Sequence, residues 1–317
     1  MSSKFIDGGG KKNGADNVRR PESAAGLTET PEKRSNMHPS AIILHDAAEL
    51  NRRDPRRRGN MVHIDYPCRV TIGGDIHGHR KNMNNILSHG FNAKSGKSVV
   101  ILQEIIHGPP DEITGLDRSI ELLISAARTK VRKPEGLVFL MGNHDLAQFT
   151  GKEISKKGRG VCHGFNKGVE AQFEEDYIEI LDAVNTFCES LPLAVRFSNG
   201  LVAAHSLPAP NSPLRNNADI IDKINSKEDY MRGGGVHEWT WGRDQDTEQI
   251  EDLAEKLQAS CFVLGHRHIF EGRERLSDIA VTIDSSGPCG HLFEFDSNTS
   301  IDSKNIEDFI KNIPAIH

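Results

Sequence analysis

The sequence predicts an α/β or α+β protein built on layered sheets, and three observations support this class. Short apolar runs of strand length alternate along the chain with segments of helical periodicity, which indicates interleaved strands and helices. No segment repeats at a fixed period, so a solenoid is not indicated. The 317 residues suffice for one large domain or two small ones.

The chain begins with a segment of distinct composition. Residues 1–40 are rich in Gly, Lys, Asn, Ser and Glu. Because such a segment has too little apolar surface to offset the entropy of ordering, we expect a disordered tail. A helical pattern follows at 41–50, and the basic run from Arg52 to Arg58 predicts a solvated linker or a contact to phosphate or an acidic partner. The expected segments are a tail at 1–40, a helical and basic lead-in at 41–67, and a main domain at 68–317.

The main domain reads as alternating strands and helices. Apolar runs rich in β-branched residues predict strands, and Asn199-Gly200 between two of them indicates a hairpin. The expected strands are 70–72, 98–102, 137–141, 193–197, 201–204, 261–264, 279–283 and 291–295. The expected helices are 79–89, 116–131, 169–190, 247–258 and 306–313.

Composition excludes several classes of protein. The formal net charge of −6 gives no signal for nucleic-acid binding. The five cysteines are scattered and form no C-x-x-C pair, which fits a reducing compartment. Because the sequence shows neither a signal peptide nor an apolar run of membrane-spanning length, we expect a cytoplasmic protein without a membrane partner.

Metal-capable side chains directly follow four of the expected strands. A lone Asp-x-His pair, such as Asp75 and His77, is a weak indication of a metal site. The carboxyl ends of strands, however, are where open α/β sheets place their ligand sites, so four such clusters together predict a metal site. The clusters are Asp75 with His77, Asn143 with His144, His205, and His266 with His268.

The order of these motifs resembles the calcineurin-like metallophosphoesterase superfamily. The motifs are Gly-Asp-Ile-His-Gly at 74–78, Gly-Asn-His-Asp at 142–145, Ala-His at 204–205 and Gly-His-Arg-His at 265–268. Residues 191–205 further resemble the serine/threonine phosphoprotein phosphatase branch. The resemblance covers about 68–295 and implies that the main domain is a four-layered α/β/β/α metallophosphoesterase sandwich.

The resemblance also implies a site with two divalent metal ions. A carboxylate would bridge both ions and a hydroxide, which attacks the phosphoryl group in line. His144 would be the general acid for the leaving oxygen, with Asp145 orienting its imidazole. The ligand types suit manganese, iron and zinc alike. One ion would take Asp75, His77 and His268, and the other Asn143, His205 and His266.

One motif departs from the family. Its pattern Gly-Asp-x-x-Asp-Arg-Gly is replaced here by Gln103-Glu-Ile-Ile-His-Gly. Glu104 aligns with the bridging aspartate, His107 stands at the second aspartate, and Gly108 replaces the phosphate-binding arginine. A glutamate can still bridge two ions, and His107 could contact phosphate or a metal. The alternative is a protein that binds metal without turnover.

Other cations could replace the missing arginine. Arg243 follows a glycine in a polar loop, where its guanidinium could bind phosphate or instead pair with Asp244 or Asp246. Arg80 directly follows the first motif and could line the mouth of the site.

The expected function is hydrolysis of phosphate monoesters, with a phosphoprotein or a small phosphate ester as substrate. One alternative is a nucleotide pyrophosphatase or phosphodiesterase on the same scaffold. The other is a non-catalytic metal-binding protein whose basic segment from Arg52 to Arg58 docks a partner.

Overall fold

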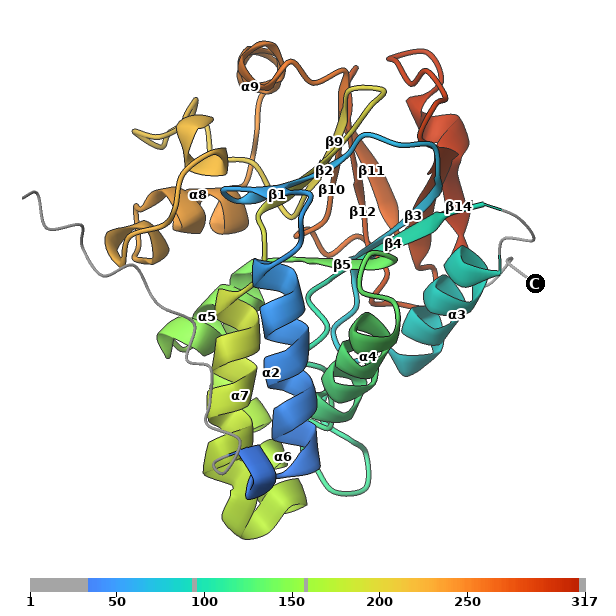
Figure 1. Ribbon diagram of the computed structural model, residues 1–317. Coiled ribbons are helices and arrows are strands. Elements are labelled where there is room, and N and C mark those ends of the chain that lie inside the picture. Colours follow the sequence, from blue (N-terminus) through green and yellow to red (C-terminus); the bar gives the residue numbers. More distant parts are fainter. Residues whose placement is uncertain (1–33, 93–95, 157–158, 314–317) are drawn as a thin grey trace, which may run out of the picture. The chain divides into compact units, whose positions relative to one another are not determined.

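Two β-sheets stack on each other within the unit formed by residues Asn36 to His317 (Figure 1). The computed structural model describes residues 34–92, 96–156 and 159–313. The larger sheet has the order β1 (Arg57–Arg58), β2 (Met61–Ile64), β8 (Ala194–Phe197), β9 (Leu201–Ala204), β10 (Cys261–Leu264), β12 (Ala280–Ile283) and β11 (Arg273–Ser277). The smaller sheet has the order β14 (Ile310–Asn312), β13 (His291–Asp296), β3 (Arg69–Asp75), β4 (Ser98–Gln103) and β5 (Leu137–Leu140). A separate hairpin pairs β6 (Ser155–Lys156) with β7 (Arg159–Gly160).

Alternation along the strands divides the apolar residues between two cores. In β4, Val99 and Ile101 belong to the cluster between the sheets, whereas Val100 and Leu102 belong to the cluster that includes the helices. Successive side chains of a strand point to opposite faces, so a continuous apolar run is expected where both faces are buried. The two stacked sheets are therefore buried on both faces, and with the outer helices they make four layers.

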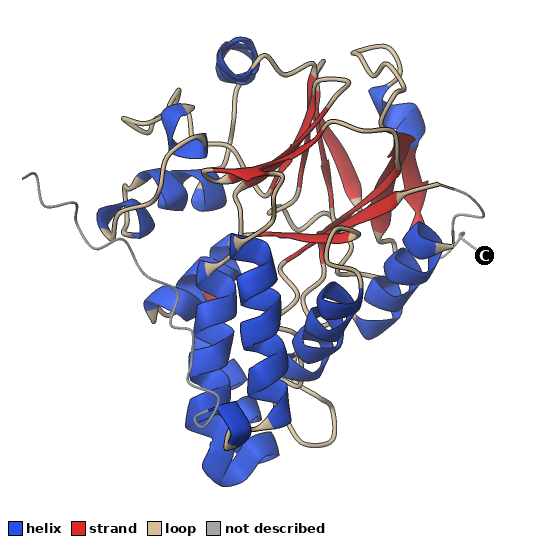
Figure 2. Cartoon of the chain, in the orientation of Figure 1, coloured by secondary structure: helices blue, strands red, loops and turns tan. Residues whose placement is uncertain are grey.

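Helices cover both outer faces (Figure 2). The helices α2, α3, α4, α6 and α7 lie on the side of the smaller sheet, and α8 and α9 on the other side (Figure 1). This is the expected α/β/β/α sandwich. The bounds are α2 (Pro39–Arg52), α3 (Arg80–Phe91), α4 (Ile120–Arg132), α5 (Asn143–Thr150), α6 (Val161–Phe173), α7 (Tyr177–Glu189), α8 (Gly235–Trp241) and α9 (Thr247–Leu257).

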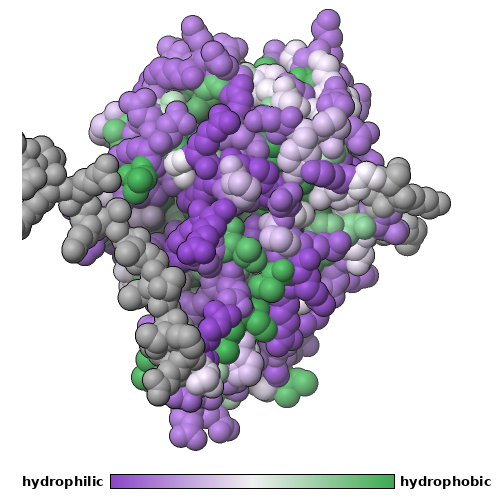
Figure 3. Space-filling view, viewed as in Figure 1, coloured by the Kyte–Doolittle hydropathy of each residue, from purple (hydrophilic) through white to green (hydrophobic). Residues whose placement is uncertain are grey.

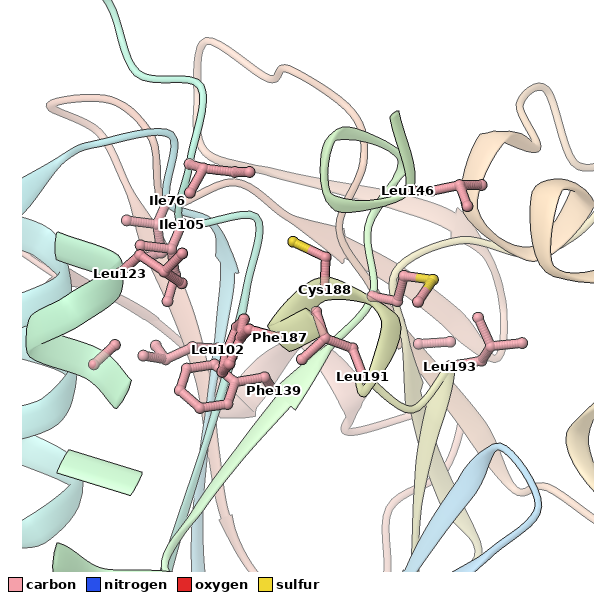
Figure 4. Packing of buried hydrophobic residues seen from close by; sticks show 14 of the residues in the cluster. Ile76, Leu102, Ile105, Leu123, Phe139, Leu146, Phe187, Cys188, Leu191 and Leu193 are labelled. Atoms are coloured by element: carbon pink, nitrogen blue, oxygen red, sulfur yellow. The ribbon is translucent and has the colours of Figure 1, made fainter. Parts of the chain in front are cut away.

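The helical core anchors the loops that carry the motifs. Ile76 and Ile105, which sit within or beside the first two motifs, point into this core near Leu123 of α4 (Figure 4). Phe139 of β5 meets Phe187 of α7 edge to face, with ring centroids 5.1 Å apart. Burial of such a side chain contributes about 1.5–3 kcal/mol to the free energy of folding, so these contacts anchor the loops at the strand ends to the core.

Two expected helices differ from the structure. The segment 169–190 is not one helix, because the chain turns at Glu174, whose φ is 49°, between α6 and α7. The segment 306–313 forms a short 3-10 helix over Ile306–Phe309, and β14 then pairs with β13. Strand β11 was not expected, since its charged, largely exposed residues lie on the edge of the sheet and lack an apolar pattern.

The basic segment is part of the fold, contrary to the expected solvated linker. Asp54 and Arg56 form a buried ion pair at 2.7 Å, and Arg57 donates to the carbonyl oxygen of Gly59. Helix α2 packs against α4 and α7, and β2 pairs with β8 in parallel. We therefore propose that the folded domain begins near Asn36 and includes the lead-in. Of the expected disordered tail at 1–40, residues 1–33 lie outside the described part of the chain, whereas Pro39 and Ser40 already belong to α2.

The face seen in Figure 3 is mainly hydrophilic, with a narrow hydrophobic strip near the boundary between α2 and α4. In the ranges that the structure describes, no helix combines the length and the apolar character needed to cross a bilayer.

Candidate metal centre

Five strands deliver the candidate ligands to one place. Strands β3, β4 and β5 run parallel, as do β9 and β10, so their carboxyl ends gather at the same edge. The side chains at these ends are buried, with at most 5% of each residue exposed. They are Asp75 at the end of β3, Glu104 after β4, Asn143 after β5, His205 after β9 and His266 after β10.

Four ligand atoms form one tight group. The His205 Nε2 atom lies 3.3 Å from Glu104 Oε1, 3.2 Å from Asn143 Oδ1 and 3.1 Å from His266 Nδ1. The Asn143 and His266 atoms are 2.7 Å apart. Ligands bound at about 2.1 Å to one divalent ion are separated by about 3–3.4 Å. The group therefore has the dimensions of a metal coordination shell.

The tautomer of His205 shows that lone pairs converge there. The Gln103 amide nitrogen donates to the carbonyl of Gly73 (3.0 Å), so its oxygen faces His205 Nδ1 at 2.8 Å and accepts the Nδ1 proton. The Nε2 atom then carries a lone pair toward Glu104 Oε1 and Asn143 Oδ1, which are also acceptors. Converging lone pairs in a buried space repel one another unless a cation lies between them, so these residues fit a metal ion.

A second group shares Glu104. In this second group, His77, Glu104 and His144 offer ligand atoms within 4.8 Å of one another. Asp75 offers a ligand atom within the same distance of Glu104 and His205. The His77 Nδ1 atom donates to the carbonyl of Ile106 (3.2 Å), which leaves Nε2 facing Glu104 Oε2 at 3.2 Å. Because one oxygen of Glu104 faces each group, this carboxylate is placed to bridge two ions.

Burial keeps the two inner histidines neutral. It lowers the pKa of His205 well below the ordinary value, with His266, His77 and Arg243 adding to the effect. Burial, followed by the charge of Arg243, lowers the pKa of His266 to about 3. Neutral imidazole is the form that binds metal, so both residues are in the ligand state at physiological pH.

Backbone strain is concentrated in this region. Among the described non-glycine residues, seven have positive φ, and four of these are His77 (42°), Glu104 (44°), His107 (62°) and His266 (69°). Such conformations cost about 1–3 kcal/mol each and persist where the surrounding structure enforces them, commonly at functional sites. The clustering therefore supports a functional role for this edge of the sheets.

Gly142 leaves the space that the long Glu104 side chain occupies. A Cβ atom at position 142 would lie 2.2 Å from Glu104 Cγ and 2.4 Å from Oε1. Glu104 Oε1 also accepts from the backbone amide of His144 at 2.8 Å, at the start of α5. The position of the Glu104 carboxylate thus depends on a glycine in the neighbouring motif.

The partner of His144 differs from the expectation. Its Nδ1 atom lies 2.9 Å from His107 Nδ1, and His107 Nε2 lies 3.0 Å from Gln148 Oε1. The Gln148 amide nitrogen donates to Asn166 at 2.9 Å, so the Gln148 oxygen accepts the His107 Nε2 proton. Neutral His107 therefore accepts the Nδ1 proton of His144. Both His107 nitrogens are engaged, which removes it as a phosphate ligand.

Asp145 does not contact the imidazole that it was expected to orient. Its carboxylate accepts from the Gly142 amide at 3.0 Å at the start of α5, and burial raises its pKa to about 7. The reason is geometric, because a residue three positions into the first turn of a helix reaches back to the N-cap amide. We assign the orienting role to His107 and a capping role to Asp145.

His268 does not join the metal centre, contrary to the expected ligand set. Its side chain is 79% exposed, and Nδ1 lies 3.0 Å from the carboxylate of buried Asp284. That carboxylate also accepts from the backbone amides of Ile269 and Ser286. Asp284 directly follows β12, and its backbone forms an isolated parallel β-bridge with Asp75. It therefore occupies a strand end, as the other site residues do.

The candidate cations take different places. Arg243 is exposed and near enough to lower the pKa values of His205 and His266, and within the described chain it forms no ion pair with Asp244 or Asp246. Arg80 instead pairs with Glu121 of α4 at 2.6 Å. Of these two arginines, Arg243 is thus the one whose charge acts on the ligand group.

Sequence reasoning missed the supporting residues Gln103, Gln148, Asn166 and Asp284. Only Asp284 had a usable signal, since it directly follows an apolar strand in the same way as Asp75. The others act through side-chain hydrogen bonds between distant segments, which no local pattern encodes.

Comparisons with known proteins find distant sequence relatives of this chain. No protein-family model matches the chain. The serine/threonine-protein phosphatase 4 catalytic subunit of Saccharomyces cerevisiae is 19% identical over 260 residues, covering 74% of this chain and 75% of that protein. The subunit of the same name from Kluyveromyces lactis is 21% identical over 215 residues, covering 66% of this chain and 59% of that protein.

Solved structures show the same fold. A protein serine/threonine phosphatase from Saccharomyces cerevisiae with similarity to human phosphatase PP5 superposes with a TM-score of 0.62 at 16% identity, covering 84% of this chain and 82% of that one. A cold-active protein-tyrosine phosphatase of a psychrophilic Shewanella gives 0.54 at 15% identity, covering 89% and 85%. The fold is thus the metallophosphoesterase sandwich. The resemblance to the calcineurin-like superfamily, on the phosphoprotein phosphatase branch, is confirmed.

Proposed function

We propose that this chain is a metal-dependent hydrolase that acts on phosphate monoesters, with phosphorylated protein side chains as its substrates. The observation that carries the proposal is the buried group of metal-capable atoms of Glu104, Asn143, His205 and His266, next to a second group that shares Glu104. The names of the sequence relatives and of the similar structures, which include both serine/threonine and tyrosine phosphatases, support the substrate class.

Each residue has a proposed part in the reaction. Asp75, His77 and Glu104 would hold one divalent ion, and Glu104, Asn143, His205 and His266 the other. Two such ions, when bound, lower the pKa of a water molecule and offset the charge of the phosphoryl oxygens. The ligand set admits manganese, iron or zinc.

The proton for the leaving oxygen is supplied by His144 in this proposal. His107 accepts the Nδ1 proton of His144, so Nε2 is left for the leaving group; His144 would act as imidazolium, giving its Nε2 proton to the leaving oxygen and returning to the neutral Nδ1–H form. The backbone amide of His144, in the first turn of α5, donates to the Glu104 carboxylate and so holds it beside His144. Proton delivery from a positioned side chain contributes about 10²–10⁴-fold in rate.

The substrate phosphate would be bound by Arg243. Its positive charge acts on both His205 and His266, and a guanidinium can bind two phosphate oxygens at once. The unpaired thiols of the five cysteines, four of them buried, favour a reducing compartment, and we propose a cytoplasmic location.

The competing docking function has less support. A basic segment that docks a partner needs several free guanidinium groups. In the described segment, Arg52, Arg53 and Arg56 form ion pairs and Arg57 donates to backbone carbonyls, which leaves Arg58.

The test combines metal content with substrate range. The chain is loaded with Mn²⁺, dialysed and assayed for metal and for hydrolysis of 4-nitrophenyl phosphate, a phosphopeptide and a dinucleoside polyphosphate. We expect two metal ions per chain and preferential hydrolysis of the monoesters. Two bound ions with no hydrolysis of any phosphate ester would contradict an enzyme, and preferential cleavage of the dinucleotide would move the proposal to nucleotide substrates.

A further inference from the structure

His107 connects two side chains on one face of α5. His144 and Gln148 are four residues apart on this helix, so their side chains lie on the same face, one turn apart. The His107 Nδ1 atom lies 2.9 Å from His144 Nδ1, and its Nε2 atom lies 3.0 Å from Gln148 Oε1. Both nitrogens of a single imidazole therefore take part in the connection.

The His107 ring is also held in place by packing. The residue is buried, with 4% of its surface exposed, and its backbone has a φ of 62°. The ring meets Phe165 of α6 edge to face, with centroids 5.4 Å apart, and Phe165 is fully buried. Because protein interiors are close-packed, such a ring cannot turn over without displacing its neighbours. What remains to be fixed is which of its nitrogens carries the proton.

The Gln148 amide determines that choice. An amide oxygen accepts a hydrogen bond and an amide nitrogen donates one, and the two exchange places when the amide group turns by half a rotation. With the oxygen toward His107, Nε2 carries the proton and Nδ1 keeps a lone pair for His144. With the nitrogen toward His107, the proton would move to Nδ1 and point at His144.

Asn166 of α6 fixes the orientation of this amide. Its side-chain oxygen accepts from the Gln148 amide nitrogen at 2.9 Å. Gln148 has only 6% of its surface exposed, so an unpaired amide group there would be costly. Turning the Gln148 amide would place its oxygen against the Asn166 oxygen and lose this hydrogen bond. The helix that packs against the His107 ring thus also supplies the acceptor.

The orientation matters because the acid form of His144 needs an acceptor at Nδ1. An imidazolium ring donates from both nitrogens. In the proposed reaction the Nε2 proton goes to the leaving oxygen, so the Nδ1 proton requires the lone pair of His107. If His107 carried its own proton on Nδ1, two N–H groups would face each other with their nitrogens 2.9 Å apart, and the imidazolium would be disfavoured.

We propose that Asn166 is a positioning residue for proton delivery. Its oxygen keeps the Gln148 oxygen toward His107, and this leaves the Nδ1 lone pair of His107 for His144. Asn166 contacts neither the substrate nor a metal ion in this scheme and acts only through the chain of hydrogen bonds, called here the amide relay. Its catalytic meaning rests on the proposed function, whereas the direction of the relay can be measured without turnover.

The first test locates the proton on His107. ¹⁵N NMR spectra of the Zn²⁺-loaded full chain, labelled at histidine, distinguish protonated from unprotonated ring nitrogens. We expect the proton on Nε2 in the wild-type chain and in Asn166→Asp, whose carboxylate can only accept. Gln148→Leu removes the acceptor at Nε2, so the proton should move to Nδ1. A proton on Nδ1 in the wild-type chain, or one that stays on Nε2 in Gln148→Leu, would overturn the relay.

The second test compares two leaving groups. The alkoxide that leaves a phosphoserine peptide needs a proton, whereas 4-nitrophenolate is stable without one. Asn166→Leu should lower kcat for the peptide about 2- to 12-fold, the contribution of one neutral hydrogen bond, with a smaller effect on 4-nitrophenyl phosphate and on KM. Asn166→Asp keeps the acceptor and should recover the lost rate. Gln172→Leu replaces an exposed amide on the same helix and, as the matched control, should leave both rates unchanged.

The outcomes separate this inference from the proposed function. Equal losses for the two substrates in Asn166→Leu, no recovery in Asn166→Asp, or equal effects of Asn166→Leu and Gln172→Leu would each overturn the positioning role. If the wild-type chain hydrolyses neither substrate, the proposed function is rejected, and the NMR spectra still decide the direction of the relay. If the wild-type chain hydrolyses both and Asn166→Leu has unchanged rates, only the role of Asn166 is rejected.

Discussion

Replacing Gly142 by alanine tests whether the space beside Glu104 holds the bridging carboxylate in place. The backbone at Gly142 is extended, with φ −101° and ψ 175°, so alanine is compatible with the main chain. The added Cβ, however, would lie 2.2 Å from Glu104 Cγ and 2.6 Å from Cδ. The substitution therefore acts through the neighbouring glutamate and not through backbone strain.

The expected magnitude follows from these distances. Carbon atoms in contact settle at about 3.5 Å, so the Glu104 side chain would move by roughly 1 Å. Metal–ligand distances tolerate about 0.2 Å, so a shift of this size removes Glu104 from both ions. We expect overpacking to cost about 1–3 kcal/mol of unfolding free energy and metal affinity to fall at least about 10- to 100-fold.

The assay is calorimetric titration of the metal-free chain with Mn²⁺, together with thermal unfolding. Glu104→Asp shortens the side chain by one methylene, so it should weaken binding alone but partly rescue Gly142→Ala in the double variant. Gly164→Ala is the control, because a Cβ at that position in α6 meets nothing within 4 Å. Unchanged metal affinity in Gly142→Ala, or no rescue by Glu104→Asp, would refute the placement of the bridge.

Three further predictions concern other parts of the account. His144→Ala should lower the hydrolysis rate about 10²–10⁴-fold while two metals remain bound, and loss of metal would show that it is a ligand. Gln103→Leu should free the ring of His205 and weaken metal binding about 10- to 100-fold by titration. Asp54→Asn should cost about 3 kcal/mol or more in urea unfolding at pH 7. Burial alone would raise the pKa of Asp54, but hydrogen bonds from Arg56 hold it below the model-compound value of 3.8, so the difference from wild type should persist above pH 3.8 and shrink as the pH falls through the lower folded-state value. A difference that does not depend on pH would contradict the ion-pair explanation.

The strand-end motifs could be predicted from sequence because local pattern and topology agree there. Asp75, His77 and His205 each follow an apolar run, and parallel strands bring their carboxyl ends to one edge whatever the loops between them do. The structure brings Glu104 close to Asp75 for the same reason. The two segments are neighbouring strands of one sheet.

The structure differs from the expected site where a side chain has more than one possible hydrogen-bond partner. Asp145 sits next to His144 in sequence, but helix geometry turns its carboxylate back to Gly142. His107, 37 residues away, provides the contact instead. His268 fits the family motif, yet Asp284 draws its ring to the exposed side of the loop. Such choices depend on tertiary distances, which neither periodicity nor spacing contains.

The prediction that the basic run from Arg52 to Arg58 is a solvated linker is wrong for a different reason. A charge run usually marks a solvated surface, but Asp54 lies within it and pairs with Arg56 in a buried position. Asp54 is the single acidic residue of the run, and its position two residues before Arg56 allows the two side chains to form the ion pair.

The central claim is that Glu104 bridges two metal ions between the ends of β3, β4, β5, β9 and β10. Anomalous diffraction from crystals of the Mn²⁺-loaded chain tests it most directly. We expect two peaks about 3.5–4 Å apart, one on each side of the Glu104 carboxylate. A single peak, or a peak held by His268 and Asp284 away from Glu104, would contradict the account.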